Sequence, residues 1–163
     1  MREIALAMML WISNATGYPI TELPSVAYLS TTEIKSYAYG CDDKPVPKSS
    51  VEVCNTKEFW DLDKGSPIAL YNHEIQTIIL NKKFNIKTIR DKSVLFHELV
   101  HHLQYSNGQN SKVTCRGKLE EEAYLLQDKW LQEKYKVDVW ETIGINHLYF
   151  YVLISCDPIH DGK

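Results

Sequence analysis

The stretch VLFHELVHHLQY, residues 94–105, has the clearest periodic pattern in the chain. Its apolar residues recur at the spacing of one helix face, after the polar residues Asp91-Lys92-Ser93, which are suited to cap a helix. On a helical wheel with His97 at zero, His101 falls at about 40° and Glu98 at about 100°, whereas the apolar residues spread from about 160° to 300°. The sequence therefore predicts a helix that buries its apolar side and turns the two histidines and the glutamate to the other side.

His97 and His101 stand four residues apart, which places two imidazoles one above the other on a helix, within reach of one cation. Zinc suits imidazole ligands, and a catalytic zinc site keeps one position for water. Glu98 follows the first histidine, and its carboxylate can take a proton from that water as a general base. The pattern predicts a Zn²⁺ site for hydrolysis; the alternative is a solvated helix face with two unrelated histidines. His102 points well away from this pair and is expected to be a supporting or surface residue.

A third protein ligand is expected, and the run Glu120-Glu121-Glu122 lies near the start of the next predicted helix, Leu119 to Tyr135. A helical wheel groups Glu120 with an inward face made of Ala123, Tyr124, Gln127 and Leu131. A carboxylate on that face needs a partner, because burying an unpaired charge is costly. Glu120 is therefore the predicted ligand. Glu121, on the polar flank, is one alternative and a solvated helix start without any ligand is the other, while Glu122 is expected on the opposite side.

The HELVH run, followed by a helix with Glu120-x-x-Ala123, resembles the gluzincin zinc metallopeptidases over residues 95–131. The chain is also similar to small bacterial minigluzincin-like proteins with an HELVHxLQ helix and a later EAYxxQ helix. The resemblance implies that the two motif histidines and Glu120 bind zinc. It also implies that Glu98 activates water to cleave peptide bonds.

The same resemblance implies a strand beside the active-site cleft. Thr77 to Leu80 is the predicted strand, and its edge is expected to hold an extended peptide. Tyr124 stands where gluzincins often carry an acidic residue. A hydrolase of this type also benefits from a donor to the developing oxyanion. Candidates for that role, or for contacts with the metal ligands, are Tyr124, His147, Tyr149 and Tyr151; for each, a packed core residue is the alternative.

The 163 residues are 44% hydrophobic and 24% charged, which suits one globular domain spanning residues 1–163. The net charge of -3 gives no general attraction to nucleic acid. The apolar run Ile4 to Ile12 is too short for a stable membrane span. We expect it to form a first helix, buried on much of its surface and ending near Gly17-Tyr18-Pro19; a signal-peptide core is the alternative.

The remaining patterns predict an α+β fold, a single zincin-like domain whose short mixed or antiparallel sheet packs on the HEXXH helix and the glutamate-bearing helix. The predicted strands are Ser25 to Ser30, Val51 to Cys54, Ile68 to Tyr71 and Thr77 to Leu80, the last two forming a hairpin. Further helices are expected from Thr31 to about Tyr37 and from Trp140 to Ile154, with a loop from Gly40 to Ser50.

The four cysteines form no CxxC pair, which disfavours a cysteine zinc knuckle. We expect two disulfides, Cys41–Cys54 and Cys115–Cys156; four reduced, buried thiols are the alternative. Disulfides indicate a secreted or periplasmic protein, and the cytoplasm is the alternative location.

The sequence as a whole predicts a zinc metallopeptidase that acts on a peptide or protein substrate, with an inhibitory propeptide or partner as a further expectation. Two alternatives stay open: a non-catalytic zinc-binding module, or pseudoenzyme, and a hydrolase of a non-peptide amide. Glu98 argues against the module, because a purely structural zinc site has no need of that carboxylate.

Overall fold

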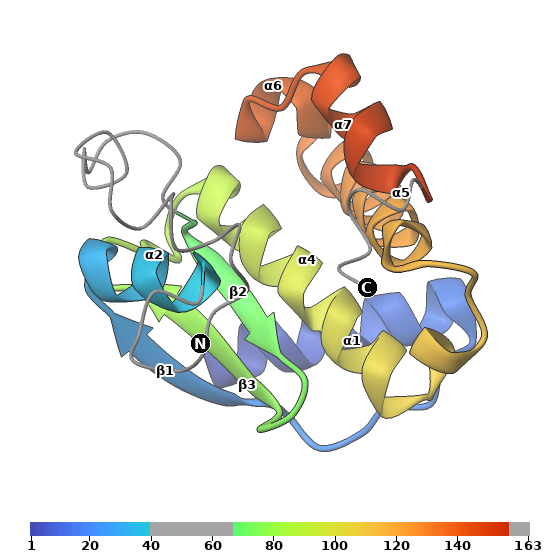
Figure 1. Cartoon of the computed structure of the whole chain (residues 1–163), viewed down its shortest axis with the longest axis horizontal. Helices are drawn as coiled ribbons and strands as arrows, with labels where there is room; N and C mark the ends of the chain where they lie inside the picture. The colour runs from blue at the N-terminus through green and yellow to red at the C-terminus, as the bar shows by residue number, and fades with distance from the viewer. Residues whose placement is uncertain (40–66, 157–163) are drawn as a thin grey trace. The chain divides into compact units, whose positions relative to one another are not determined.

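The computed structural model describes residues 1–39 and 67–156, which form two compact units (Figure 1). Met1–Pro24 and the chain from Asn85 onward make up a helical unit, and Ser25–Phe84 contributes a sheet unit. The described residues contain six α-helices and one small three-stranded mixed sheet, so the predicted α+β class is confirmed. The expected single domain stays a prediction. No helix in the described ranges is long and apolar enough to cross a membrane.

The sheet unit is built from β1 (Ser25–Leu29), β2 (Ala69–Asn72) and β3 (Thr77–Asn81). β2 and β3 form the predicted antiparallel hairpin, in which Ala69 pairs with Leu80. The Asn72 side chain accepts hydrogen bonds from the two backbone N–H groups of Glu74 and Ile75, which stabilises the turn between the strands. β1 runs parallel to β3, and its bounds confirm the strand predicted from Ser25.

β3 is the central strand of this sheet, because the strand order is β1-β3-β2. Its backbone is paired with β1 on one side and with β2 on the other, and all five of its residues are buried. Addition of a peptide strand requires an edge with unpaired N–H and C=O groups. The expectation that Thr77 to Leu80 offers such an edge is therefore wrong, although the strand itself is where it was predicted.

The sheet unit also contains α2 (Thr31–Tyr39), which contacts β1 and β3. A capping box precedes it: the Glu33 carboxylate accepts from the Ser30 backbone N–H at 2.7 Å, and the Ser30 hydroxyl accepts from the Glu33 N–H at 3.3 Å. The helix begins at Thr31, as predicted, and ends two residues later than the predicted Tyr37. The loop from Gly40, the strand Val51 to Cys54 and the disulfide Cys41–Cys54 lie outside the described residues.

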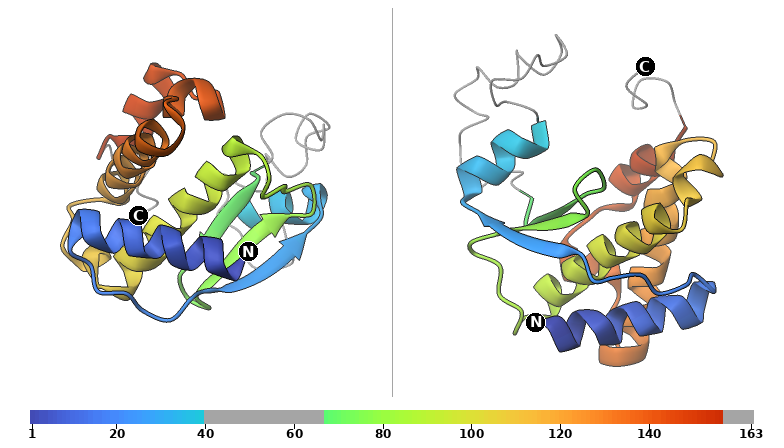
Figure 2. Two further views of the ribbon diagram at one scale, coloured as in Figure 1. Left: turned by 180° about the vertical axis from the view of Figure 1, so that it is seen from behind. Right: turned by 90° about the horizontal axis from the view of Figure 1, so that it is seen from below.

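The helical unit is formed by a long helix, α4, with other helices packed around it. α1 and α5 both pack against α4, which Figure 2 shows in yellow-green between the blue and orange helices. Phe96 of α4 stacks on Trp130 at 4.8 Å between ring centroids and meets the edge of Trp11 at 5.4 Å, which joins the three helices in one aromatic core. The bounds of the elements are α1 (Arg2–Thr16), α4 (Ile89–Ser106), the 3₁₀ helix η1 (Gln109–Ser111), α5 (Arg116–Tyr135), α6 (Val139–Ile143) and α7 (His147–Ile154).

α1 confirms the predicted first helix and its stop. Gly17, with a φ of 77°, adopts the left-handed conformation that ends many helices. The burial is more limited than expected, since Met9 and Ile12 are fully buried whereas Leu6 and Leu10 are 44% and 47% exposed. The helix is amphipathic, with one side in the core.

α4 begins one turn earlier than the sequence analysis expected. Its N-cap is Thr88, whose hydroxyl accepts from the Asp91 backbone N–H at 3.1 Å. The Asp91 carboxylate in turn accepts from the Asn85 N–H at 2.7 Å. The expected cap at Asp91-Lys92-Ser93 is therefore wrong, because Thr88 satisfies the first free N–H groups and Asp91 already lies inside the helix.

The last predicted helix, Trp140 to Ile154, is in fact two helices. Gly144, with a φ of 72°, ends α6, and the Asn146 side chain caps α7 by accepting from the Tyr149 N–H at 2.7 Å. The apolar content of the segment predicted one helix, but Gly144 ends the first helix and Asn146 begins the second.

α5 and α7 approach each other closely where the chain is cross-linked. Cys115 and Cys156 form the predicted disulfide, with their Cα atoms 5.5 Å apart. A Cβ atom on Gly117 would lie 2.8 Å from the backbone carbon and oxygen of Ile154. Only glycine allows this approach without a shift of the backbone.

Gly117→Ala should destabilise the protein by about 1–3 kcal/mol, because the added methyl group meets backbone atoms that cannot rotate away. A loss of stability would point to the close contact, because alanine elsewhere in a helix is favoured over glycine by about 1 kcal/mol. Denaturant unfolding measures the change, with the exposed neighbour Lys118→Ala as control and an expected effect within about 0.5 kcal/mol. Equal or higher stability of Gly117→Ala would contradict the close contact.

Candidate metal centre

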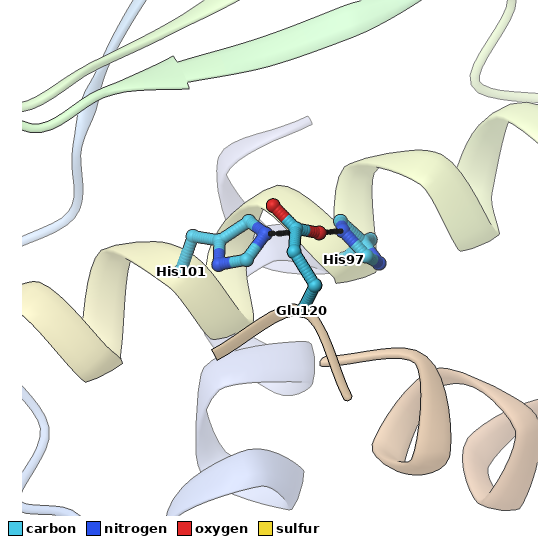
Figure 3. A group of neighbouring side chains, drawn as sticks. All are labelled: His97, His101 and Glu120. Carbon is cyan, nitrogen blue, oxygen red and sulfur yellow. Dashed lines mark hydrogen bonds and ion pairs between the residues drawn. The ribbon is translucent and has the colours of Figure 1, made fainter. Parts of the chain in front are cut away.

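α4 and α5 bring three side chains together at one point, and they are the residues that the sequence predicts as ligands. His97 and His101 come from α4, and Glu120 comes from the second turn of α5 with its carboxylate between the two imidazoles (Figure 3). One Glu120 oxygen lies 3.2 Å from Nε2 of His97 and 3.3 Å from Nε2 of His101, and the two Nε2 atoms lie 3.1 Å apart. Both histidines are buried, and the Glu120 side chain is 14% exposed.

A glutamine amide fixes the orientation of the first imidazole. Nδ1 of His97 lies 3.1 Å from Oε1 of Gln127. The amide cannot be turned round, because its Nε2 donates to the backbone carbonyl of Ser93 at 2.9 Å. An amide oxygen only accepts, so Nδ1 of His97 must carry a hydrogen. In the neutral imidazole, Nε2 therefore presents a lone pair toward Glu120.

The second imidazole is held in the same way. Nδ1 of His101 lies 2.8 Å from Oε1 of Gln104, whose Nε2 donates to the Leu119 carbonyl at 2.9 Å and to the Glu122 carboxylate at 2.8 Å. Both hydrogens of the Gln104 amide are thus used on acceptors, and its oxygen must face the imidazole. Nε2 of His101 presents its lone pair to the same point as Nε2 of His97.

Two nitrogen lone pairs and a carboxylate oxygen therefore face one another in a buried place. Such a set of acceptors is unfavourable unless a cation lies among them, either a proton or a metal ion. A tetrahedral zinc ion with ligand bonds of about 2.0–2.2 Å places its ligand atoms about 3.3–3.6 Å apart. The observed separations of 3.1–3.3 Å come close to this spacing. The three atoms fit a zinc ion and leave one coordination position for water or substrate.

The electrostatics of the centre favour a cation. Burial alone would lower the pKa of His101, but the charge of Glu120, its hydrogen bond and the charge of Glu98 raise that pKa to about 8. Burial would raise the pKa of Glu120, yet His101 and then His97 hold it well below its usual range. A proton on His101 thus balances the carboxylate when no metal ion does.

Glu98, the predicted general base, lies at the centre. It is 8% exposed, and its charge acts on both His101 and Tyr124. Glu98 directly follows His97 on α4, as the proposed general base requires.

The other two glutamates of the run bind elsewhere. Glu121 pairs with Lys118 at 2.7 Å on the surface of α5. Glu122 accepts from the Tyr18 hydroxyl at 2.8 Å and from the Gln104 amide, so it supports the amide that holds His101. The expectation that Glu122 points away from the site is wrong, because its carboxylate lies between Tyr18, after the end of α1, and Gln104 of α4.

His102 lies inside the protein and apart from the three possible metal ligands. It is 1% exposed, with Nε2 at 2.8 Å from the Glu22 carbonyl oxygen and 3.1 Å from the Thr21 hydroxyl. Its partners belong to the segment after α1, and the metal-ligand group does not include it. Of the two roles expected for it, the surface role is wrong.

Two of the four candidate donors lie near the centre. The Tyr124 ring packs on His97 at 4.4 Å between centroids, and burial followed by its neighbours Glu120, Tyr149 and Glu98 raises the pKa of its hydroxyl. Tyr149, 55% exposed, lines a cavity together with Glu120. His147 packs instead on Trp140, with 4.9 Å between ring centroids, and Tyr151 is 66% exposed.

The cavity beside Glu120 has a volume of about 280 Å³. Its walls come from the start of α5 and from α7, and they are formed by Arg116, Gly117, Glu120, Tyr149, Val152, Leu153 and Ser155. It gives the metal centre a neighbouring space for a ligand.

Sequence reasoning missed Gln104 and Gln127 as functional residues. Both carried a detectable signal: Gln104 lies three residues after His101 on the same helix, and Gln127 belongs to the inward face that also contains Glu120. A glutamine on a buried helix face requires several hydrogen-bond partners, which a histidine ligand and a backbone carbonyl provide here.

Comparison with known proteins places the chain in one family. A family model described as a domain of unknown function (DUF6647) matches residues 2–158. No curated protein and no solved structure matches the chain.

The metal-free protein should lose stability as the pH rises from about 6.5 to about 8. The folded pKa of His101, about 8, exceeds the ordinary value of 6.5, so its contribution is complete below pH 6.5 and disappears as the pH passes 8. The loss is on the order of 2 kcal/mol by the linkage relation. Denaturant unfolding at several pH values, without metal, measures it.

Glu120→Gln is the matched control for this pH dependence, because it removes the charge that raises the pKa of His101 and keeps the shape of the side chain. The variant should lose less stability over the same pH range. Equal slopes for the two proteins would show that Glu120 and His101 are not coupled.

Proposed function

The chain belongs to the DUF6647 family, and we propose that it is a zinc-dependent hydrolase of the peptidase type, with a zincin-like centre formed by His97, His101 and Glu120. The observation that carries the proposal is the convergence of three acceptor atoms, two of them on imidazoles whose orientations are fixed by buried amides. Two ligands come from one helix and the third from the next, as in the gluzincins that the sequence resembles.

The donor set favours zinc over the hard cations. Imidazole nitrogens suit zinc, whereas calcium and magnesium prefer oxygen ligands alone. Each histidine also donates through Nδ1 to an amide oxygen, the type of outer contact that orients metal-binding imidazoles. A bound zinc ion would polarise the scissile carbonyl and lower the pKa of the attacking water.

The residues of the chain supply the remaining steps. Glu98 takes a proton from the attacking water and passes it to the leaving amine, since it is the carboxylate beside the ligands that does not belong to the ligand group. Tyr149 is the best-placed donor to the developing oxyanion, because it lines the cavity next to Glu120. Tyr124 packs on the His97 ring and holds it in place.

A peptide bond is the proposed target, and a small non-peptide amide is the second candidate. The cavity of about 280 Å³ accommodates one compact group, which both a single side chain of a peptide and a small amide can supply. A non-catalytic zinc module would make no use of Glu98 at this position. The Cys115–Cys156 disulfide supports the further proposal of a secreted or periplasmic location.

The wild-type protein should contain about one zinc ion per chain, and Glu120→Ala should lose most of it, because two histidines alone bind zinc weakly. Elemental analysis of proteins purified side by side gives the answer. Glu121→Ala is the matched control, since Glu121 lies on the same helix and pairs with Lys118 on its surface. A wild-type protein that takes up no zinc at neutral pH would remove the basis of the proposal.

Glu98→Gln should keep its zinc and lose hydrolysis by about 10²–10⁴-fold, because the amide cannot accept the proton. Peptide libraries and a panel of small N-acyl amides serve as substrates, and zinc content is measured on the same samples. Turnover that persists in the zinc-loaded variant would exclude Glu98 as the general base. Turnover of the small amides alone would select the second candidate.

A further inference from the structure

The cavity next to the metal centre combines an apolar wall with a positive charge. Its apolar wall comes from Val152 and Leu153 of α7, and a cationic side chain, Arg116, stands at the start of α5. Hydrolysis at the metal centre requires ligands, a base and an oxyanion donor. The proposed function assigns these roles to other residues, so the pairing of an apolar wall with a guanidinium bears on which substrate is bound.

Arg116 can bind an incoming anion. Its side chain is 76% exposed and forms a long ion pair with Glu120, in which Nε lies 3.9 Å from a carboxylate oxygen. This distance is too long for a hydrogen bond, so the N–H groups of the guanidinium stay available to an anion. The nearby cation Lys118 is instead engaged with Glu121 at 2.7 Å. A guanidinium is always charged and offers a planar fork that matches a carboxylate with two parallel hydrogen bonds. Arg116 also begins α5, where the helix dipole favours a negative charge.

Glu120 lines the same cavity, and its charge would repel an anion. A cation held by Glu120 and the two histidines offsets that charge, and Arg116 is then the group that decides the sign of the potential in the cavity. The inference therefore rests on the proposed function, because it needs the metal ion in place.

We propose that this cavity is a specificity pocket for an apolar substrate group that carries a carboxylate, and that Arg116 binds the carboxylate. A C-terminal residue of a peptide and an acidic side chain both have this chemistry. The apolar wall receives the carbon skeleton, and the volume limits the group to about one residue.

The test is a binding titration with zinc-loaded protein carrying Glu98→Gln, so that no ligand is consumed. N-acetyl-L-leucine presents a C-terminal carboxylate, N-acetyl-L-glutamic acid α-amide presents an acidic side chain, and N-acetyl-L-leucinamide presents neither. At least one of the two acids should bind about tenfold more tightly than the neutral amide, which corresponds to one charge-assisted contact. The acid that shows the preference identifies the source of the carboxylate.

Adding Arg116→Gln should remove this preference, with about tenfold weaker binding of the acid and unchanged zinc content and affinity for the neutral amide. Lys118→Gln is the matched control and should leave all three affinities unchanged. Equal binding of both acids and the amide would overturn the proposal. A preference that persists in Arg116→Gln would also overturn it, because the carboxylate would then be bound by the metal.

The two proposals fail in distinguishable ways. Zinc content and hydrolysis by the wild-type protein report on the centre, whereas the difference between acid and amide binding reports on the cavity. Hydrolysis without that difference would reject only the specificity pocket, and the difference without hydrolysis would reject only the catalytic role.

Discussion

Three hydrogen-bond acceptors that face one another inside the protein are the constraint on which the helical unit depends. Distances of 3.1–3.3 Å separate the three atoms, which are Nε2 of His97, Nε2 of His101 and a carboxylate oxygen of Glu120. This arrangement is stable only because a proton or a metal ion balances it and because packing holds the helices together. The aromatic core around Phe96 and the amides of Gln104 and Gln127 supply that packing and orientation.

The buried partners of the two imidazoles are neutral amides and not carboxylates. A carboxylate at either position would increase the basicity of the ligand and reduce the net positive charge at the centre. With Gln104 and Gln127 there, Glu120 and the nearby Glu98 would offset the charge of a dication bound as proposed. Such a centre would keep its cation strongly polarising, which suits the proposed hydrolysis better than tight storage of a metal ion.

Much of the structure could be predicted from local sequence patterns, because helix periodicity, a hairpin turn and a helix-ending glycine each depend on a few neighbouring residues. The features predicted in this way are the HELVH helix, the hairpin before it and the inward direction of Glu120. Strand order is not local, so the central position of β3 and the loss of its expected edge could not be read from Thr77 to Leu80. The role of Glu122 was missed for a similar reason, because its partner Tyr18 is distant in sequence.

The disulfide between Cys115 and Cys156 and the contact at Gly117 fix the distance between α5 and the end of α7. The ligands of the centre lie on α4 and α5, whereas α7 contributes to the cavity wall and contains no ligand. The apolar part of the cavity wall is therefore encoded apart from the three candidate ligands. In the proposed hydrolase, exchanges at Val152 or Leu153 would reshape the pocket without altering those ligands, which makes these two positions the natural place for redesign.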